Sequence, residues 1–203
     1  GYLFVAVGNG ASGPGERYDH SDSVLELSTS AGLVDSFSPR SWASDNSQDL
    51  DLGSQGPALV GGWVFAAGKS GTAYVLRRSH LGGIGGEVSS ARICTSFGGT
   101  AVVGSVVYVP CTDGIRAVRI TSHGNMRVAW RASSSVTGSP VVGGRRVWSL
   151  DPSGGWLYSL NPRTGRAKAR VQVGSTTRFA TPAIAGSNLI VPTESGLTVV
   201  GTR

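Results

Sequence analysis

The chain has 203 residues, of which 39% are apolar and 15% are charged, and it carries a formal net charge of +6. No apolar run approaches the ~18 residues that a membrane-spanning helix requires, so we expect no membrane span. Glycine occupies 31 positions, about twice its usual share of ~7%, and Val, Ser and Thr are abundant. This composition favours strands joined by turns over helices.

Charged residues are unevenly distributed along the sequence. Residues 1–51 contain eight acids and two arginines, whereas residues 52–203 contain four acids and sixteen bases. A basic excess is one signature of nucleic-acid binding. Here the arginines are spread through predicted strands and turns without interleaved aromatic residues, so we predict a solvated basic face and no nucleic-acid partner.

The first predicted elements are three strands within residues 1–52, read from LFVAVGN, SDSVLELS and GLVDSFSP. From residue 53 onward, four segments repeat one pattern at intervals of 43, 40 and 42 residues. Each begins at Pro or Thr, has a large apolar residue eight positions later, and has a turn glycine fourteen positions later. These columns are Pro57, Thr100, Pro140 and Pro182; Phe65, Tyr108, Trp148 and Ile190; and Gly71, Gly114, Gly154 and Gly196.

A third strand such as TAYVL and a fourth such as MRVAWRA follow these columns. Four short strands in ~40–45 residues is the period of a β-propeller blade. The sequence therefore predicts an all-β fold, a β-propeller of four-stranded antiparallel blades. The full blades are expected at 53–97, 98–137 and 138–179, between partial blades at 1–52 and 180–203.

The predicted propeller is an incomplete arc. A blade presents an apolar face to its neighbour, so an arc leaves part of its sheet surface uncovered. Two expectations stay open: the arc belongs to a larger ring, or it self-associates through its open blade edges.

Cys94 and Cys111 are the only cysteines, and they flank TSFGGTAVVGSVVYVP. This segment predicts two strands joined by a turn at Gly104-Ser105, which brings its ends together. We therefore predict a disulfide and an oxidising compartment, with a secreted, periplasmic or cell-envelope location. The alternative is a pair of buried thiols in neighbouring strands.

Several short motifs lack the context that their chemistry needs. GNGASG, residues 8–13, is followed by no helical pattern, and GKSGT, residues 68–72, has Trp63 where a phosphate loop requires glycine. No GxSxG is present, and the three histidines lack metal-ligand spacing. The sequence therefore does not favour a nucleotide-binding protein or a serine hydrolase.

Four polar residues fall on predicted loops that open on one rim of a propeller. Asp49 and Asp51 precede the first strand of the blade at 53–97, whereas Asn9 and Lys69 end the second strands of two successive blades. In an extended segment the two carboxylates would share a face. Carboxylate and amide oxygens suit Ca²⁺, and a neighbouring lysine holds a carboxylate ionised. We predict a cation site, a general base, or both; the alternative is ordinary turn residues, capping groups and a solvated lysine.

The segment LYSLNPRTGRAKAR resembles the repeat of pyrroloquinoline-quinone (PQQ) propellers, in which a strand ending in Leu-Asp or Leu-Asn precedes a Thr-Gly turn. Residues 3–86 also resemble PQQ-dependent alcohol and polyvinyl-alcohol dehydrogenases. The matching pieces, in the family's order, are VGN, SDSVLEL, DLDLGSQGPAL, GKSGTAYVL and GGIGG.

This resemblance implies PQQ and Ca²⁺ as cofactors. It implies that Asn9 is a Ca²⁺ ligand, that Asp49 or Asp51 is the base that takes the alcohol proton, and that Lys69 binds the quinone oxygens. The family's docking tryptophan is replaced by Ala169. Its vicinal disulfide, stacking tryptophan and glutamate ligand have no counterpart among these residues.

Two hypotheses follow from the sequence. The first is that these residues form the downstream part of a secreted, quinoprotein dehydrogenase-like propeller that oxidises alcohols with PQQ and Ca²⁺. These 203 residues alone are expected to be inactive. The second is a propeller that binds a protein or cell-envelope partner without catalysis. Propellers host both kinds of function, so the fold does not choose between them.

Overall fold

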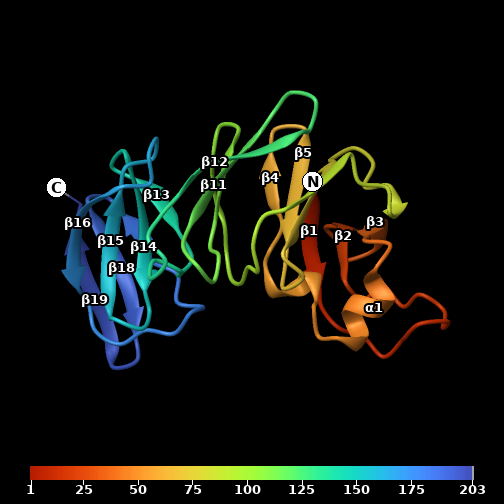
Figure 1. The fold of residues 1–203 in the computed structure, drawn as a ribbon, viewed down its shortest axis with the longest axis horizontal. Helices are drawn as coiled ribbons and strands as arrows, with labels where there is room; N and C mark the ends of the chain where they lie inside the picture. Colours follow the sequence, from red (N-terminus) through yellow and green to blue (C-terminus); the bar gives the residue numbers. More distant parts are fainter. Residues whose placement is uncertain (203) are drawn as a thin grey trace. The chain divides into compact units, whose positions relative to one another are not determined.

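The computed structural model describes residues 1–202 and consists almost entirely of β-strands (Figure 1). The chain forms two compact units. Unit 1 comprises residues 1–96 and 120–126, and unit 2 comprises the other described residues. No helix among the described residues is long and apolar enough to cross a membrane.

Unit 1 contains two sheets and the only helical turns of the described chain. The first sheet has the order β1-β2-β3-β7, in which β7 pairs with β3 in parallel and the other pairs are antiparallel. The second sheet has the order β4-β5-β6-β8. The elements are β1 (Tyr2–Val7), β2 (Ser23–Ser28), β3 (Leu33–Ser38), α1 (Trp42–Ser47), the 3-10 turn η1 (Leu52–Ser54), β4 (Ala58–Val60), β5 (Trp63–Ala67), β6 (Thr72–Arg77), β7 (Gly83–Ile84) and β8 (Ser89–Arg92).

The remaining strands form two four-stranded sheets and one three-stranded sheet. Their orders are β12-β11-β10-β9, β13-β14-β15-β16 and β17-β18-β19. The strands are β9 (Ala101–Val103), β10 (Val106–Val109), β11 (Arg116–Ile120), β12 (Met126–Arg131), β13 (Val141–Gly143), β14 (Arg146–Asp151), β15 (Trp156–Leu160), β16 (Ala167–Gln172), β17 (Ala183–Ala185), β18 (Asn188–Thr193) and β19 (Gly196–Gly201).

The predicted repeat appears as one shared register in four sheets. In each sheet, the large apolar residue of the repeat lies opposite the residue that directly follows the Pro or Thr column. The pairs are Ala58 with Phe65, Ala101 with Tyr108, Val141 with Trp148, and Ala183 with Ile190. The prediction of an all-β fold built from four-stranded antiparallel sheets is therefore confirmed.

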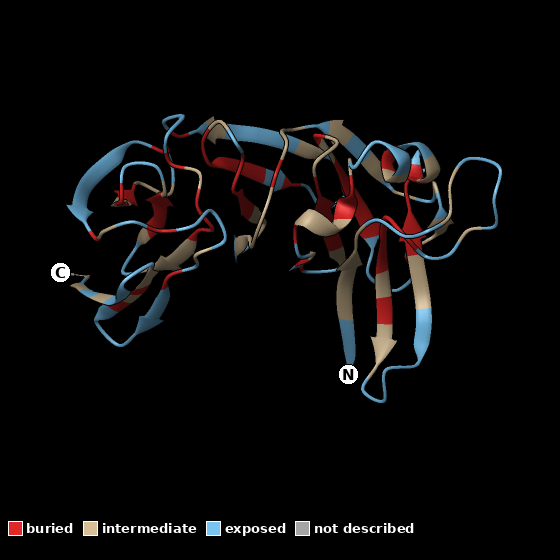
Figure 2. Ribbon diagram, turned by 90° about the horizontal axis from the view of Figure 1, so that it is seen from below, coloured by how far each residue is buried: buried red, intermediate tan, exposed pale blue. Residues whose placement is uncertain are grey.

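Apolar residues of successive sheets pack together within each unit, and Figure 2 shows the buried residues on the strands. In unit 1 the core joins β2 and β3 to β5 and β6. In unit 2 one cluster joins residues of β10 and β11 to residues of β14 and β15, and another joins β14 and β15 to β18. This face-to-face packing of sheets is the interaction that propeller blades need.

The predicted hairpin between the cysteines is present as β9 and β10. Gly104 has a φ of +57° in the turn between them, a conformation that glycine adopts without steric cost. Cys94 and Cys111 are both disulfide-bonded. The disulfide prediction is thus confirmed.

Candidate functional site

The four predicted rim residues lie together in unit 1. Asn9 Nδ2 donates a hydrogen bond of 2.9 Å to Asp49 Oδ1. Lys69 Nζ lies 2.6 Å from the same oxygen and 3.2 Å from Asp51 Oδ1. Asn9 follows β1, Lys69 follows β5, and the aspartates lie between α1 and η1. Three loops that are distant in sequence therefore contribute to one cluster of charges, which we call the rim cluster.

The backbone that carries the aspartates is not the extended segment expected from the sequence. Helix α1 ends at Ser47, Asp49 has a φ of +55°, and η1 begins at Leu52. The two carboxylates do not converge by strand alternation. They converge because both approach the ammonium group of Lys69.

Glycines allow the loops of the rim cluster to touch through their backbones. A Cβ atom on Gly53 would lie 2.6 Å from Gly8 Cα, and one on Gly68 would lie 2.7 Å from Leu52 Cα. Real Cβ atoms do not approach other atoms so closely, so neither position has room for a side chain. This packing also lets Lys69 N donate a hydrogen bond of 3.1 Å to Asp51 O.

The two aspartates differ in their accessibility. Asp51 is buried with 7% of its surface exposed, whereas the side chain of Asp49 is 71% exposed. Both carboxylates form an ion pair with the ammonium group of Lys69. Only Asp49 is open to a reactant arriving from solvent.

Protonation in the rim cluster follows from these contacts. The hydrogen bond and the charge of Lys69 lower the pKa of Asp49 below its usual value, and the bond to Asp49 raises the pKa of Lys69. An opposite charge at this distance favours the charged form of each partner. At neutral pH the cluster therefore contains ionised Asp49 and protonated Lys69.

Asp22, which is not among the residues predicted from the sequence, is a titratable neighbour of the rim cluster. It is fully buried, its Oδ1 accepts a 3.1 Å bond from Leu52 N, and its own N–H donates to Gly8 O. Burial raises its pKa to about 6, with further contributions from Asp45 and Asp51. The sequence SDS around Asp22 does not indicate a raised pKa, because the burial of Asp22 depends on packing between β2 and the loop that precedes β4.

Helix α1, also absent from the sequence prediction, fixes the loop that follows Asn9. Asn46 Oδ1 accepts a 2.7 Å bond from Gly10 N, and Asn46 Nδ2 donates to Gly10 O. Asp19 accepts bonds from Ala11 N and Ser12 N. These contacts hold the backbone beside the rim cluster in place.

The residues of the rim cluster fit a quinone better than they fit a calcium ion. Lys69 offers a charged donor for quinone oxygens, and Asp49 offers an accessible carboxylate. For Ca²⁺ the cluster offers the oxygens of Asn9, Asp49 and Asp51, fewer than the 6–8 that the ion usually takes. No group of three His, Cys, Asp or Glu side chains within residues 1–202 is placed to hold a metal. A calcium ion here would need further oxygen ligands.

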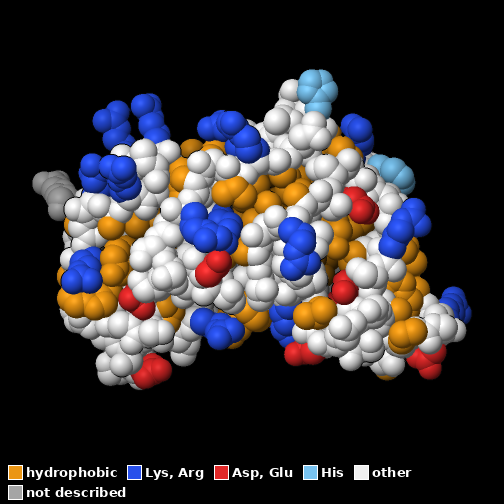
Figure 3. Space-filling model, in the orientation of Figure 1, with side chains coloured by type: hydrophobic (Ala, Val, Ile, Leu, Met, Phe, Trp, Pro, Cys, Tyr) orange, Lys and Arg blue, Asp and Glu red, His pale blue; other side chains and the backbone are white. Residues whose placement is uncertain are grey.

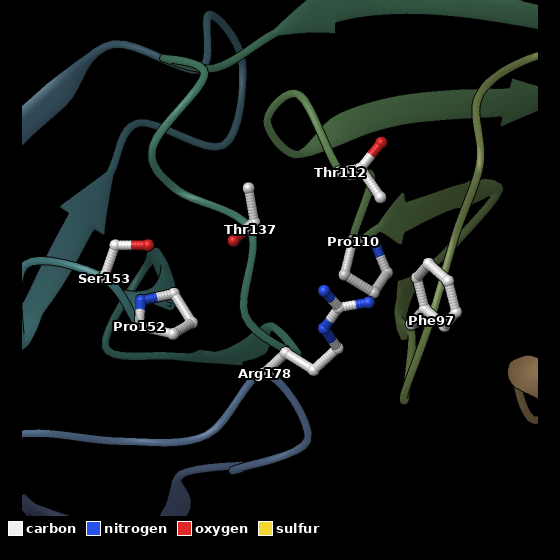
Figure 4. A pocket seen from close by; sticks show the side chains of 7 residues that line it. All are labelled: Phe97, Pro110, Thr112, Thr137, Pro152, Ser153 and Arg178. Carbon is white, nitrogen blue, oxygen red and sulfur yellow. The ribbon is translucent and has the colours of Figure 1, made fainter.

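Unit 2 has a cavity of about 280 Å³ next to the ends of β10 and β14 (Figure 4). Its polar lining is supplied by Thr112, Thr137, Ser153 and Arg178. The guanidinium of Arg178 lies 4.7 Å from the ring centre of Phe97. Arg178 forms no ion pair with another of the described residues, so its charge is available to a ligand.

Basic side chains are spread over the protein surface. Residues 97–119 and 127–203 contain twelve Lys and Arg against three Asp and Glu. Figure 3 shows Lys and Arg distributed over the visible face instead of forming a single continuous patch. This distribution agrees with a solvated basic surface.

No family model and no curated protein sequence matches the chain. Several solved structures are similar to it. BamB from Moraxella catarrhalis superposes with a TM-score of 0.65 at 16% identity, covering 90% of this chain and 52% of BamB. The β-propeller domain of Myceliophteria thermophila Cps50 (Swd1) gives a TM-score of 0.60 at 14% identity, covering 85% of this chain and 55% of that domain.

The dihydro-heme d1 dehydrogenase NirN gives a TM-score of 0.61 at 18% identity, covering 98% of this chain and 41% of NirN. The chain thus spans about half the length of these structures. At such low identity the likeness concerns the fold alone. Together with the repeated antiparallel sheets, it shows that the chain has a β-propeller fold.

Proposed function

We propose that the rim cluster is part of a PQQ-binding site in a quinoprotein dehydrogenase-like propeller. The observation that carries this proposal is the meeting of Asn9, Asp49 and Lys69 at hydrogen-bonding distance. These residues come from separate pieces of the sequence that resemble PQQ-dependent alcohol dehydrogenases. The disulfide supports a location outside the cytoplasm.

In this proposal the exposed Asp49 is the group that accepts the hydroxyl proton of the alcohol. Lys69 keeps that carboxylate ionised and donates hydrogen bonds to the quinone oxygens. The buried Asp51 holds the ammonium group of Lys69 from the inner side. The chemistry that a bound quinone would supply is acceptance of the hydride from the alcohol carbon.

Equilibrium titration with PQQ, followed by absorbance with and without CaCl₂, tests this proposal. We expect the chain to bind PQQ and Lys69→Met to weaken binding at least ~10-fold, because a charge-assisted hydrogen bond contributes about 1.5–3 kcal/mol. Lys168→Met is the matched control, since Lys168 lies on the exposed strand β16. Absence of PQQ binding, or equal affinity in Lys69→Met and wild type, would refute the proposal.

A second candidate function is binding of a protein partner without catalysis. The observation in its favour is the cavity of unit 2, where Arg178 lies against Phe97 without a carboxylate partner among the described residues. A carboxylate on an acidic protein segment would complement that guanidinium. This candidate replaces the first if PQQ does not bind and an acidic partner is retained by wild type but lost in Arg178→Ala.

A further inference from the structure

A second cavity lies in unit 1, outside the rim cluster, and has a volume of about 900 Å³. Strands β2 and β3 form one side with Glu26, Val34 and Asp35. The other side is formed by the Gly61-Gly62 turn and by residues 78–80, which follow β6. The cavity therefore lies between the first two sheets, at the end of the apolar core that they share.

Glu26 is the unusual residue of this cavity. It is only 7% exposed, and its side chain forms no hydrogen bond or ion pair with any of residues 1–202. On β2 it shares a face with Val24, which belongs to the core between the sheets. Buried carboxylates are normally paired or hydrogen-bonded, because an isolated charge is costly to remove from water.

The neighbours of Glu26 do not supply the missing partner. Asp35 lies directly opposite it on β3, so two carboxylates occupy adjacent positions of one sheet face. Asp35 accepts bonds from Ser36 N and Leu81 N, each at 2.7 Å, and lies 3.4 Å from His80 Nδ1. Asp35 is thus satisfied by protein groups, whereas Glu26 is not.

We propose that this cavity binds a small organic ligand through a single protonated amine, with Glu26 as its counter-ion. A metal ion is a poorer match, because the acids and His80 are not grouped as a three-ligand site. The exposed side chains of Tyr2 and Val34 line the mouth and provide apolar contact for the body of the ligand. Arg78 lines the same cavity without an ion pair within the described chain, and its positive charge opposes the binding of a cation that does not reach Glu26.

Three probes of one shape separate charge from apolar contact: 2-phenylethylamine, 2-phenylethanol and phenylacetate. Calorimetric titration of the purified chain should show binding of the amine at least ~10-fold tighter than binding of the alcohol or the anion. Glu26→Gln keeps the side-chain shape and should reduce amine affinity at least ~10-fold, to the level of the alcohol. The control Glu16→Gln removes the same charge from unit 1 but not from the cavity, and should leave the affinity unchanged.

Each other outcome would overturn the proposal. The cavity does not recognise an amine if wild type binds no 2-phenylethylamine at millimolar concentration, or if the amine and the alcohol bind equally. The counter-ion is not Glu26 if Glu26→Gln binds the amine as wild type does. Far-ultraviolet circular dichroism confirms that the variant is folded, which is expected because the substitution keeps the size of the side chain and breaks no side-chain hydrogen bond among residues 1–202.

Discussion

Lys69 and Asp51 are joined twice, once through their backbones and once through their side chains. Lys69 N donates a 3.1 Å bond to Asp51 O, and Lys69 Nζ lies 3.2 Å from Asp51 Oδ1. The backbone bond positions the loops, and the ammonium group neutralises a buried carboxylate. Substitution of the Lys69 side chain therefore removes the ion pair with Asp51 and leaves the backbone hydrogen bond in place.

Lys69→Met keeps the backbone bond and removes the positive charge. We expect the free energy of unfolding to fall by about 1–3 kcal/mol, because the buried carboxylate of Asp51 loses its counter-ion. Urea denaturation at pH 7 measures the change, with Lys168→Met as the exposed control. Equal stability of the two variants would show that the ion pair contributes nothing to the fold.

Asp22→Asn should stabilise the protein at neutral pH and have little effect in acid. The pKa of Asp22 is raised to about 6 by burial, so the folded state holds this proton more tightly than the unfolded state. Stability is consequently lost as the pH rises through ~4 to 6. Asn can accept the Leu52 hydrogen bond and tolerates the φ of +47° found at this position.

We expect Asp22→Asn to add about 1–2 kcal/mol at pH 7.5 and almost nothing at pH 3.5, where the wild-type carboxyl is mostly protonated in both states. Thermal denaturation across this pH range measures the difference. A variant that is equally or less stable than wild type at pH 7.5 would mean that Asp22 is ionised without cost.

Gly53→Ala tests the backbone packing beneath the rim cluster. The added methyl group would overlap Gly8 and Val7, with Val7 C only 2.6 Å away, so the loops must separate. Overpacking of this kind costs about 1–3 kcal/mol. Gly56→Ala is the control, because a Cβ there meets no atom within 4 Å. The packing would be looser than described if both alanine variants melted at the same temperature.

The disulfide should contribute about 3 kcal/mol to stability, since closing a loop of ~15 residues restricts the unfolded chain by that amount. The double variant Cys94→Ser/Cys111→Ser should therefore unfold at lower denaturant concentration. A reducing agent should destabilise wild type by a similar amount and leave the double variant unchanged. Insensitivity of wild type to reduction under unfolding conditions would contradict this prediction.

The repeat could be predicted because its signal is local. Phe65, Tyr108 and Trp148 recur at one place in the pattern and occupy one register of their sheets. The burial of Glu26 could also be predicted, because side chains alternate between the two faces of a strand and Glu26 therefore shares a face with Val24. Its missing partner, however, depends on what the opposite sheet contributes.

Other features could not be read from the sequence because they depend on tertiary contacts. Helix α1 has six residues, too few to form a stable helix alone, and Asn46 ties it to the loop after Asn9. Burial of Asp22 and the left-handed conformation of Asp49 likewise arise from loop packing. The four rim residues were identified from the chain, but the geometry that distinguishes Asp49 from Asp51 was not.

The role of Lys69 can be measured most directly by NMR of lysine side chains labelled with ¹³Cε and ¹⁵Nζ. The sequence has only two lysines, Lys69 and Lys168, so Lys168 serves as an internal reference in every spectrum. We predict that the pKa of Lys69 lies above the usual value of a lysine side chain, because its ammonium group bonds Asp49, and that PQQ shifts the Lys69 signal alone. A Lys69 pKa at or below the usual lysine value, or a Lys69 signal unmoved by saturating PQQ, would contradict the proposed site.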